Sequence, residues 1–193
     1  MRCVFLFLVL FFSFQQNAWC ENSLTEFLVA KPSMPDPRFQ ESVIVMLYHN
    51  QEEGAAGLVV NKPIETMSIR QLFKSSNLSP PDKMEEKEIT IYWGGPVDPQ
   101  HIFFIHSSDY KSDDFITSNN DFTITREPKI LFDIAKNEGP KEYIILLGLT
   151  VWESGQLDSE MMRGDWDKKL NNYTPLFDNG KEMWNNLISS RDI

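Results

Sequence analysis

The sequence predicts a single α+β domain with a bent, largely antiparallel sheet and flanking helices. Short β-branched runs separated by glycine and proline turns are typical of strands joined as hairpins. Apolar residues at helical spacing recur in a few short segments between these runs, so we expect strands and helices to be intermixed. The length of 193 residues suits one domain that buries its own core.

The first twenty residues differ in kind from the rest. Arg2 precedes an apolar run over residues 4–14, and Ala18-Trp19-Cys20 follows with small residues one apart. This pattern predicts a secretory signal peptide over residues 1–20, followed by a domain over residues 21–193. The apolar run is too short to span a bilayer. We therefore expect an exported protein, periplasmic or secreted, with no membrane insertion after cleavage.

Two alternatives to a cleaved signal stay open. Cys20 would be lipidated in a lipoprotein, although Asn17 and Trp19 are poor residues for that motif. A misassigned start codon would instead make the protein cytoplasmic. Determination of the mature N-terminus distinguishes these possibilities.

Charge and cysteine content exclude several classes of site. The chain carries 28 acidic and 18 basic residues, a formal charge of −10, and its basic residues are scattered. Such a field repels phosphate backbones, so direct nucleic-acid binding is not expected. Cys3 and Cys20 both lie in the predicted signal. The mature chain would then have no disulfide, zinc–thiolate site or cysteine nucleophile.

The first part of the domain is predicted to be a hairpin with a stiff corner. A strand over residues 24–30 meets three prolines that prevent regular structure over residues 31–38. Asp36 is placed to accept backbone N–H groups in an Asx-type turn. A buried strand over residues 42–49 then pairs with a strand over residues 57–60 through a glycine turn.

The middle of the chain alternates between short elements. A helix is expected over residues 68–77, starting at Thr66 or Ser68, and residues 82–88 read as solvated linker or a short helical turn. Strands are predicted over residues 89–93, 102–106 and 122–125, with turns over 94–96 and 97–100.

The C-terminal part carries the central strand and most of the helices. Residues 143–151 are the most apolar segment of the mature chain and predict a central strand. A helix over residues 127–137 buries Ile130, Leu131 and Ile134. Three further helices are predicted over residues 155–163 (capped by Ser154 and ended by Gly164), over 165–170 (capped by Asp165) and over 179–190.

The turn formed by Gly94, Gly95, Pro96 and Val97 has two interpretations. It directly follows a strand, so one interpretation is that its backbone N–H groups face an anion. A tight turn needing positive φ is favoured, because neither phosphate-loop pattern follows the glycines.

The three histidines offer a weak case for catalysis. His106 lies next to Ser107, Ser108 and Asp109, so a serine–histidine hydrolase is one hypothesis, with His49 as an alternative base. Neighbouring residues on a strand point to opposite faces, and the sequence has no G-x-S-x-G motif. Structural histidines are favoured. No spacing supports a metal site, so we expect no metal and no cofactor.

A third candidate site surrounds the junction between residues 152 and 160. Gln156, Asp158 and Glu160 lie on the first turns of one predicted helix, close to Trp152. Such a cluster would bind a polar ligand or a partner's peptide groups. From these residues alone, a capped helix with a solvated face and a Glu160–Arg163 pair is favoured.

Four motifs, in order and with matching spacing, resemble the AlgH/YqgE family of bacterial proteins. The likeness extends from Leu24 to Leu187 and rests on the following residues: Leu28-Val29-Ala30, Pro32, Asp36-Pro37-Arg38-Phe39, Ser42-Val43-Ile44, His49, Gly54-Ala55, Gly57-Leu58-Val59, Asn61-Lys62-Pro63, Gly94-Gly95-Pro96-Val97, His106, Gly148, Trp152, Gly155-Gln156-Leu157, Glu160 and Trp166.

The resemblance implies a bifurcated sheet folded into a pseudo-barrel and no established enzymatic activity. Some members carry the label of transcriptional regulator, which rests on the genetics of alginate production. This chain departs from the family in its leader. It also departs at Leu149-Thr150-Val151, where the family has a stretch containing glycine and tyrosine, so an altered pocket is expected there.

We therefore expect a non-enzymatic binding or interaction domain whose partner is an unknown protein or a small polar ligand. Turns and strand ends on a rigid scaffold are where recognition usually occurs. The alternatives are a small hydrolase using His106 or His49, and a transcriptional regulator that acts indirectly. The candidate surface consists of Asp36, Arg38, His49, Asn61, Gly94, Gly95, Pro96, Val97, His106, Trp152, Gln156 and Glu160.

Overall fold

The computed structural model describes residues 26–170, 176–177 and 180–189. The predicted signal peptide lies outside the described residues. The strands are β1 (Glu26–Ala30), β2 (Val43–Asn50), β3 (Gly54–Val59), β4 (Pro63–Ser68), β5 (Glu88–Trp93), β6 (Val97–Ser107), β7 (Thr117–Ser118), β8 (Phe122–Thr125), β9 (Tyr143–Trp152) and β10 (Trp166–Leu170). The helices are α1 (Ile69–Ser75), α2 (Lys129–Ala135), α3 (Gln156–Arg163) and α4 (Gly180–Ser189).

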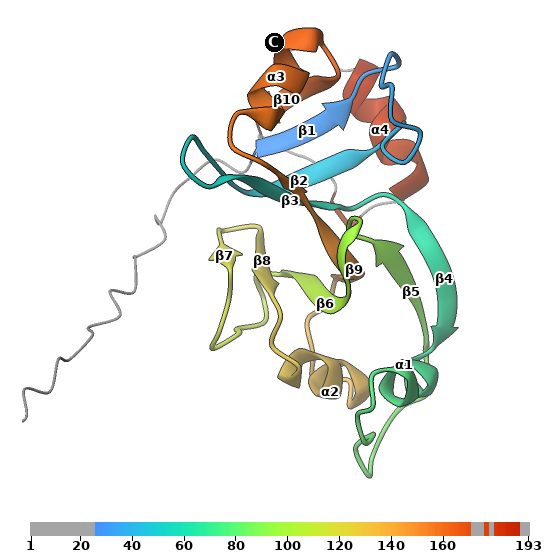
Figure 1. Ribbon diagram of the computed structural model, residues 1–193. Helices are drawn as coiled ribbons and strands as arrows, with labels where there is room; N and C mark the ends of the chain where they lie inside the picture. Colours follow the sequence, from blue (N-terminus) through green and yellow to red (C-terminus); the bar gives the residue numbers. More distant parts are fainter. Residues whose placement is uncertain (1–25, 171–175, 178–179, 190–193) are drawn as a thin grey trace, which may run out of the picture.

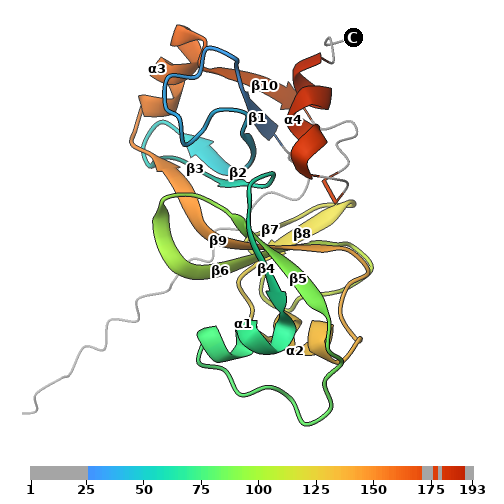
Figure 2. The ribbon, with the colours of Figure 1, turned by 90° about the vertical axis from the view of Figure 1, so that its right-hand side faces the viewer.

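Strand β9 is the centre of the sheet, as its apolar sequence predicts. One end, Thr150–Trp152, pairs with β3, whereas Ile145–Leu147 pairs with β5 on one side and β6 on the other. Every strand pair except β5–β9 is antiparallel. In Figures 1 and 2, β1–β3, β10, α3 and α4 lie above, and β4–β8, α1 and α2 below.

The predicted α+β class and largely antiparallel sheet are confirmed. The sheet follows the order β10-β1-β2-β3-β9-β6-β8-β7, and β5 and β4 branch from β9. Because its two ends do not pair with each other, the sheet is bent and branched without closing into a barrel. The closure implied by the term pseudo-barrel is therefore not present.

Side chains of β9 enter cores on both faces of the strand. Leu146 packs with β1, β2, β3 and α4, and Ile145 packs against α1 and α2. The predicted inward stripe of α2 is confirmed, because Ile130, Leu131 and Ile134 are all buried. Among the described residues, each helix is too short or too polar to span a bilayer.

Local turn chemistry at several predicted points is confirmed. Asp36 Oδ1 accepts the Arg38 backbone N–H at 2.9 Å, which is the expected Asx turn. Ser68 caps α1 in a capping box with Gln71, and Gly164 ends α3 with φ +79°. Ser154 does not cap α3. Its hydroxyl instead donates to the Gln51 carbonyl at 2.6 Å, and Gly155 is the capping residue.

Three segments differ from their prediction. Residues 63–68 form edge strand β4, whose exposed side chains give no apolar alternation. Residues 97–100 begin β6 as an irregular strand, not a separate turn, because the register with β9 shifts between Val97 and Ile102. Residues 166–170 form β10, which pairs with all of β1, so sheet pairing overrides the helix predicted from a cap at Asp165 alone. Residues 82–88 contain no helix.

Candidate functional site

Six of the predicted residues line one cleft of about 210 Å³, which we call the Glu160 cleft. It lies between the turn that contains Pro35 and Pro37 (residues 31–38, the proline turn), the end of β9 and helix α3. Figure 2 shows the proline turn beside α3. Buried Phe39 and Trp166 line it as well, together with Thr150 and Val151 of the stretch where the chain departs from the AlgH/YqgE pattern. The six are Asp36, Arg38, Pro96, Trp152, Gln156 and Glu160.

The Glu160 carboxylate is held by three donors. Its Oε2 accepts the indole N–H of Trp152 at 2.9 Å and that of Trp166 at 2.8 Å. Its Oε1 accepts the Gln156 amide at 2.9 Å, as a spacing of four residues on α3 allows. Glu160 does not form the predicted pair with Arg163, which binds Asp165 at 2.7 Å. Three hydrogen bonds fix the carboxylate in one orientation.

The cleft combines an exposed ion pair with an aromatic wall. Arg38 Nη2 lies 2.6 Å from Asp36 Oδ2, and the Arg38 side chain is 60% exposed. The hydrogen bond from Arg38 is the main reason that the pKa of Asp36 lies below its usual value, and the same bond raises the pKa of Arg38. The Phe39 ring lies 5.4 Å from Trp93 and 5.9 Å from Trp166.

The other predicted residues lie outside this cleft. Asn61 is buried, accepts the Val43 N–H at 2.8 Å and donates to the Glu41 carbonyl at 2.8 Å. Its role is to join the corner of the hairpin to the end of β3. His49 Nε2 lies 3.1 Å from Asp158 Oδ1 on α3, within hydrogen-bond distance.

Gly94 and Gly95 allow the chain to pass directly over β9. The Gly94 N–H donates to the Leu147 carbonyl at 2.8 Å, and the Gly94 carbonyl accepts the Val59 N–H at 2.9 Å. A Cβ on Gly95 would lie 2.2 Å from the backbone carbon of Leu149. The Gly94 backbone groups therefore form hydrogen bonds within the fold. This agrees with the tight-turn interpretation and not with an anion site.

His106 is buried in the lower half of the molecule, with no exposed surface. Its Nδ1 lies 2.9 Å from the Ser107 carbonyl and its Nε2 lies 3.0 Å from Ser112 Oγ. Ser107 itself donates to Asp109 at 2.5 Å. A histidine–serine contact is therefore present, but the imidazole has no surface that a substrate in solution can reach. This geometry does not support the hydrolase hypothesis at His106.

The buried imidazole should make stability depend on pH. Burial lowers the pKa of His106 below the ordinary 6.5. As pH falls below 6.5, the unfolded chain takes up a proton that the folded protein does not, so the free energy of unfolding decreases until the folded pKa is reached. Each unit of depression corresponds to about 1.4 kcal/mol.

The measurement is urea unfolding between pH 5 and 7, compared with His106→Gln. We expect the free energy of unfolding to rise with pH more steeply in the wild type than in the variant. The charge of Asp109 acts on His106 in the opposite direction to burial, because it raises the histidine pKa. The pKa of Asp109 is itself lowered, chiefly by the hydrogen bond from Ser107, so this carboxyl titrates below that range. Equal slopes in the two proteins would contradict a depressed histidine pKa.

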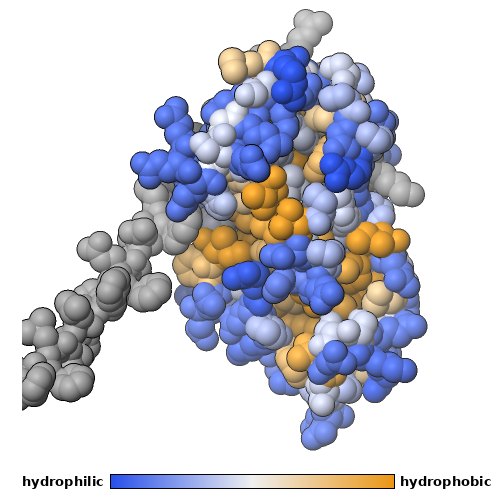
Figure 3. All heavy atoms as spheres, in the orientation of Figure 1, coloured by the Kyte–Doolittle hydropathy of each residue, from blue (hydrophilic) through white to orange (hydrophobic). Residues whose placement is uncertain are grey.

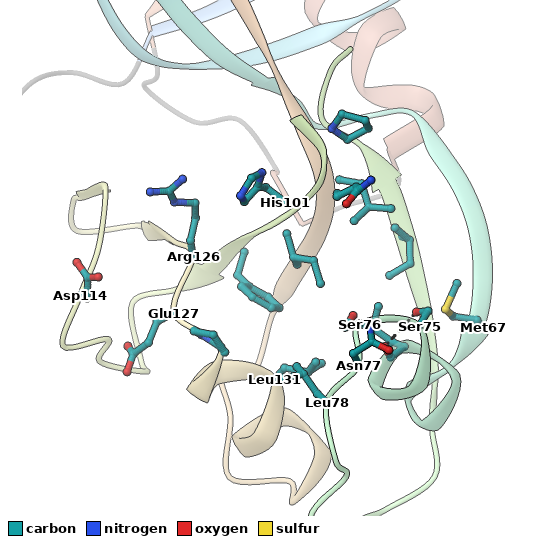
Figure 4. Close-up of a pocket in the computed structure, with 18 residues that line it drawn as sticks. Met67, Ser75, Ser76, Asn77, Leu78, His101, Asp114, Arg126, Glu127 and Leu131 are labelled. Atoms are coloured by element: carbon teal, nitrogen blue, oxygen red, sulfur yellow. Dashed lines mark hydrogen bonds between the residues drawn. The ribbon is translucent and has the colours of Figure 1, made fainter. Parts of the chain in front are cut away.

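A second and larger cavity was not predicted from the sequence. It has a volume of about 900 Å³ and lies between α1, α2 and the first half of β6 (Figure 4). Its lining residues come from segments far apart in the chain, and no local motif marks them. In the described part of the chain, no group of three or more His, Cys, Asp or Glu side chains is arranged to hold a metal ion.

Comparison with known proteins gives the chain its family. A UPF0301 protein of Photorhabdus laumondii is 37% identical over 142 residues, which cover 72% of this chain and 75% of that protein. A UPF0301 protein of Rickettsia canadensis is 34% identical over 157 residues, covering 80% of each. The family model described as AlgH-like matches residues 27–193.

Two solved structures share the fold. The solution structure of the AlgH protein from Pseudomonas aeruginosa has a TM-score of 0.70 at 30% identity and covers 86% of both chains. A protein of Corynebacterium diphtheriae has a TM-score of 0.65 at 18% identity over 92% of both chains, which shows the fold alone. From the matched residues, the relatives and the fold together, this chain belongs to the AlgH-like family of UPF0301 proteins.

Proposed function

We propose that the protein is a non-enzymatic binding domain that recognises a polypeptide segment of a partner protein at the Glu160 cleft. The observation that carries this proposal is the fixed Glu160 carboxylate inside a cleft with an aromatic wall. Glu160 Oε1 accepts one hydrogen bond, so it retains a lone pair for a donor from a ligand. A carboxylate that is already oriented loses little freedom when it binds.

Size favours a segment of a protein over a free small molecule. The cleft volume of about 210 Å³ is below the roughly 300–1,000 Å³ of pockets that enclose whole ligands. It suits one or two side chains that enter from a longer chain outside. Of the two kinds of partner expected from the sequence, the small volume of the cleft therefore favours a protein over a small polar ligand.

The rim of the cleft is suited to a protein surface. Val151 lines the cleft and is 42% exposed, and Val97, directly after the lining residue Pro96, is 38% exposed. Exposed apolar side chains beside fixed polar groups are typical of protein interfaces. Indirect action on transcription would require such a partner, whereas the net charge of −10 disfavours direct contact with DNA.

The test is selection from a displayed random-peptide library on the purified protein, followed by titration of the enriched peptides against single variants. Arg38→Ala and Val151→Asp should weaken binding at least tenfold, because the first removes an exposed cation that lines the cleft and the second places a charge on its apolar rim. Matched controls are Arg70→Ala, a similarly exposed arginine in an ion pair on α1, and Ile64→Asp, an exposed apolar residue on β4.

Both controls should bind like the wild type. Enriched peptides that bind all four variants equally, or no enrichment over an unrelated protein, would overturn the proposal. Thermal unfolding of each variant identifies any loss of binding that comes from loss of the fold.

A further inference from the structure

The cavity of about 900 Å³ is separate from the Glu160 cleft. The two share no lining residue, and they lie in opposite halves of the molecule. Figure 3 shows apolar atoms gathered at the middle height of the face drawn in Figure 1, with hydrophilic atoms above and below them. The volume lies within the range of pockets that enclose small organic ligands.

The inner wall of the cavity is apolar and the outer rim is polar. Leu72, Ile91, Phe104 and Leu131 line it, each no more than 3% exposed. The outer lining is polar and comes from two places: Ser75, Ser76 and Asn77 at the end of α1, and Gln100 and His101 on β6. In Figure 4 Ser75, Ser76 and Asn77 lie across the cavity from His101. Such a wall suits a ligand with an apolar body and one polar end.

Arg126 supplies a positive charge at the rim. Of the four arginines that the structure describes, Arg38, Arg70 and Arg163 each pair with a carboxylate. Arg126 instead places its guanidinium 5.7 Å from the centre of the Phe103 ring, and no described carboxylate lies within 4.0 Å of it. Arg126 and His101 both line the cavity, and Figure 4 draws them on the same side of it. This guanidinium is therefore available to an anion.

The anion should carry a single charge. Asp114 and Glu127 also line the cavity on the side of Arg126, so a doubly charged phosphate would meet two like charges. A carboxylate matches the fork of a guanidinium with two parallel hydrogen bonds.

From the wall, the rim and the unpaired guanidinium together, we propose that this cavity binds an amphipathic monocarboxylic acid. Its hydrocarbon chain would lie against Leu72, Phe104 and Leu131, and its carboxylate would bind Arg126. The sequence gives no sign of this site because the wall and the rim come from α1, β5, β6, β9, α2 and the segment before α2.

The test is calorimetric titration of the purified protein with decanoate, decanol and decyltrimethylammonium, each below its micelle concentration. Decanoate should bind, and decanol and decyltrimethylammonium should bind at least tenfold more weakly. Arg126→Gln should weaken decanoate at least tenfold. Arg70→Gln, an arginine on α1 that does not line the cavity, should bind it like the wild type.

A second variant tests the cavity itself. Gln100 is an exposed rim residue, so Gln100→Trp should fill the mouth and abolish decanoate binding without lowering the melting temperature. Amide resonances of residues 75–78, 126–127 and 129–131 should shift with decanoate, and those of α3 should not. Equal binding of the three probes, no binding of decanoate, or full binding by Arg126→Gln would overturn the proposal.

Discussion

Gly148→Ala is expected to lower the free energy of unfolding by roughly 2–5 kcal/mol. Gly148 has φ +74°, and a Cβ there would lie 2.5 Å from the Gly95 carbonyl oxygen and 2.8 Å from that of Val97. Both neighbours are backbone atoms, so neither is able to rotate away as a side chain would. Equilibrium urea unfolding followed by circular dichroism measures the loss.

Two other glycines provide matched controls. Gly155 and Gly164 have φ of +73° and +79°, but a Cβ at either meets nothing within 4 Å. Alanine at these positions should cost only the left-handed backbone conformation, about 1–2 kcal/mol. Equal losses at all three positions would show that the close approach of the turn over residues 94–97 to β9 contributes nothing to stability.

Glu160→Ala is expected to lower the free energy of unfolding by about 3 kcal/mol, because two indole N–H groups lose a charged acceptor. Trp152 and Trp166 are each 3% exposed, so their indoles have little access to water. The rings pack edge to face at 6.0 Å, and the shared carboxylate holds this arrangement. Urea unfolding followed by tryptophan fluorescence reports both the stability and the environment of the indoles.

Glu160→Gln is the informative comparison. Its amide oxygen still accepts a hydrogen bond, so the loss should be about 1 kcal/mol. Asp158→Ala, on the same helix but outside the cleft, should leave the tryptophan emission unchanged. If Glu160→Ala were as stable as Glu160→Gln, the carboxylate would not organise the indoles.

The parts of the fold that depend only on residues close together in the chain could be predicted from the sequence. The Asx turn at Asp36, the hairpin of β2 and β3, and the apolar strand β9 each follow from a short stretch of sequence. Strands β4 and β10 do not follow from any short stretch of sequence. Most of the β4 side chains are exposed, and β10 depends on pairing with β1, which lies more than a hundred residues earlier.

Only part of the candidate surface could be predicted, because distant segments of the chain decide which residues meet in one cleft. Asp36, Arg38 and Pro96 belong to turns, whereas Trp152, Gln156 and Glu160 belong to a strand–helix junction, and the fold brings these segments to one cleft. In the sequence, His106 and Asn61 resemble the residues of this cleft, because they too are polar residues at strand ends. In the structure both are buried in the interior. Burial depends on distant segments, and so does the 900 Å³ cavity.

One strand supplies walls to both proposed sites. Leu147 lines the large cavity, and three residues further along the same strand Thr150 begins the wall of the Glu160 cleft. A β-strand held by neighbours on both edges does not bend freely between such close points. The two halves should therefore melt in a single cooperative transition, and a fragment that lacks β9 should leave both sites unformed.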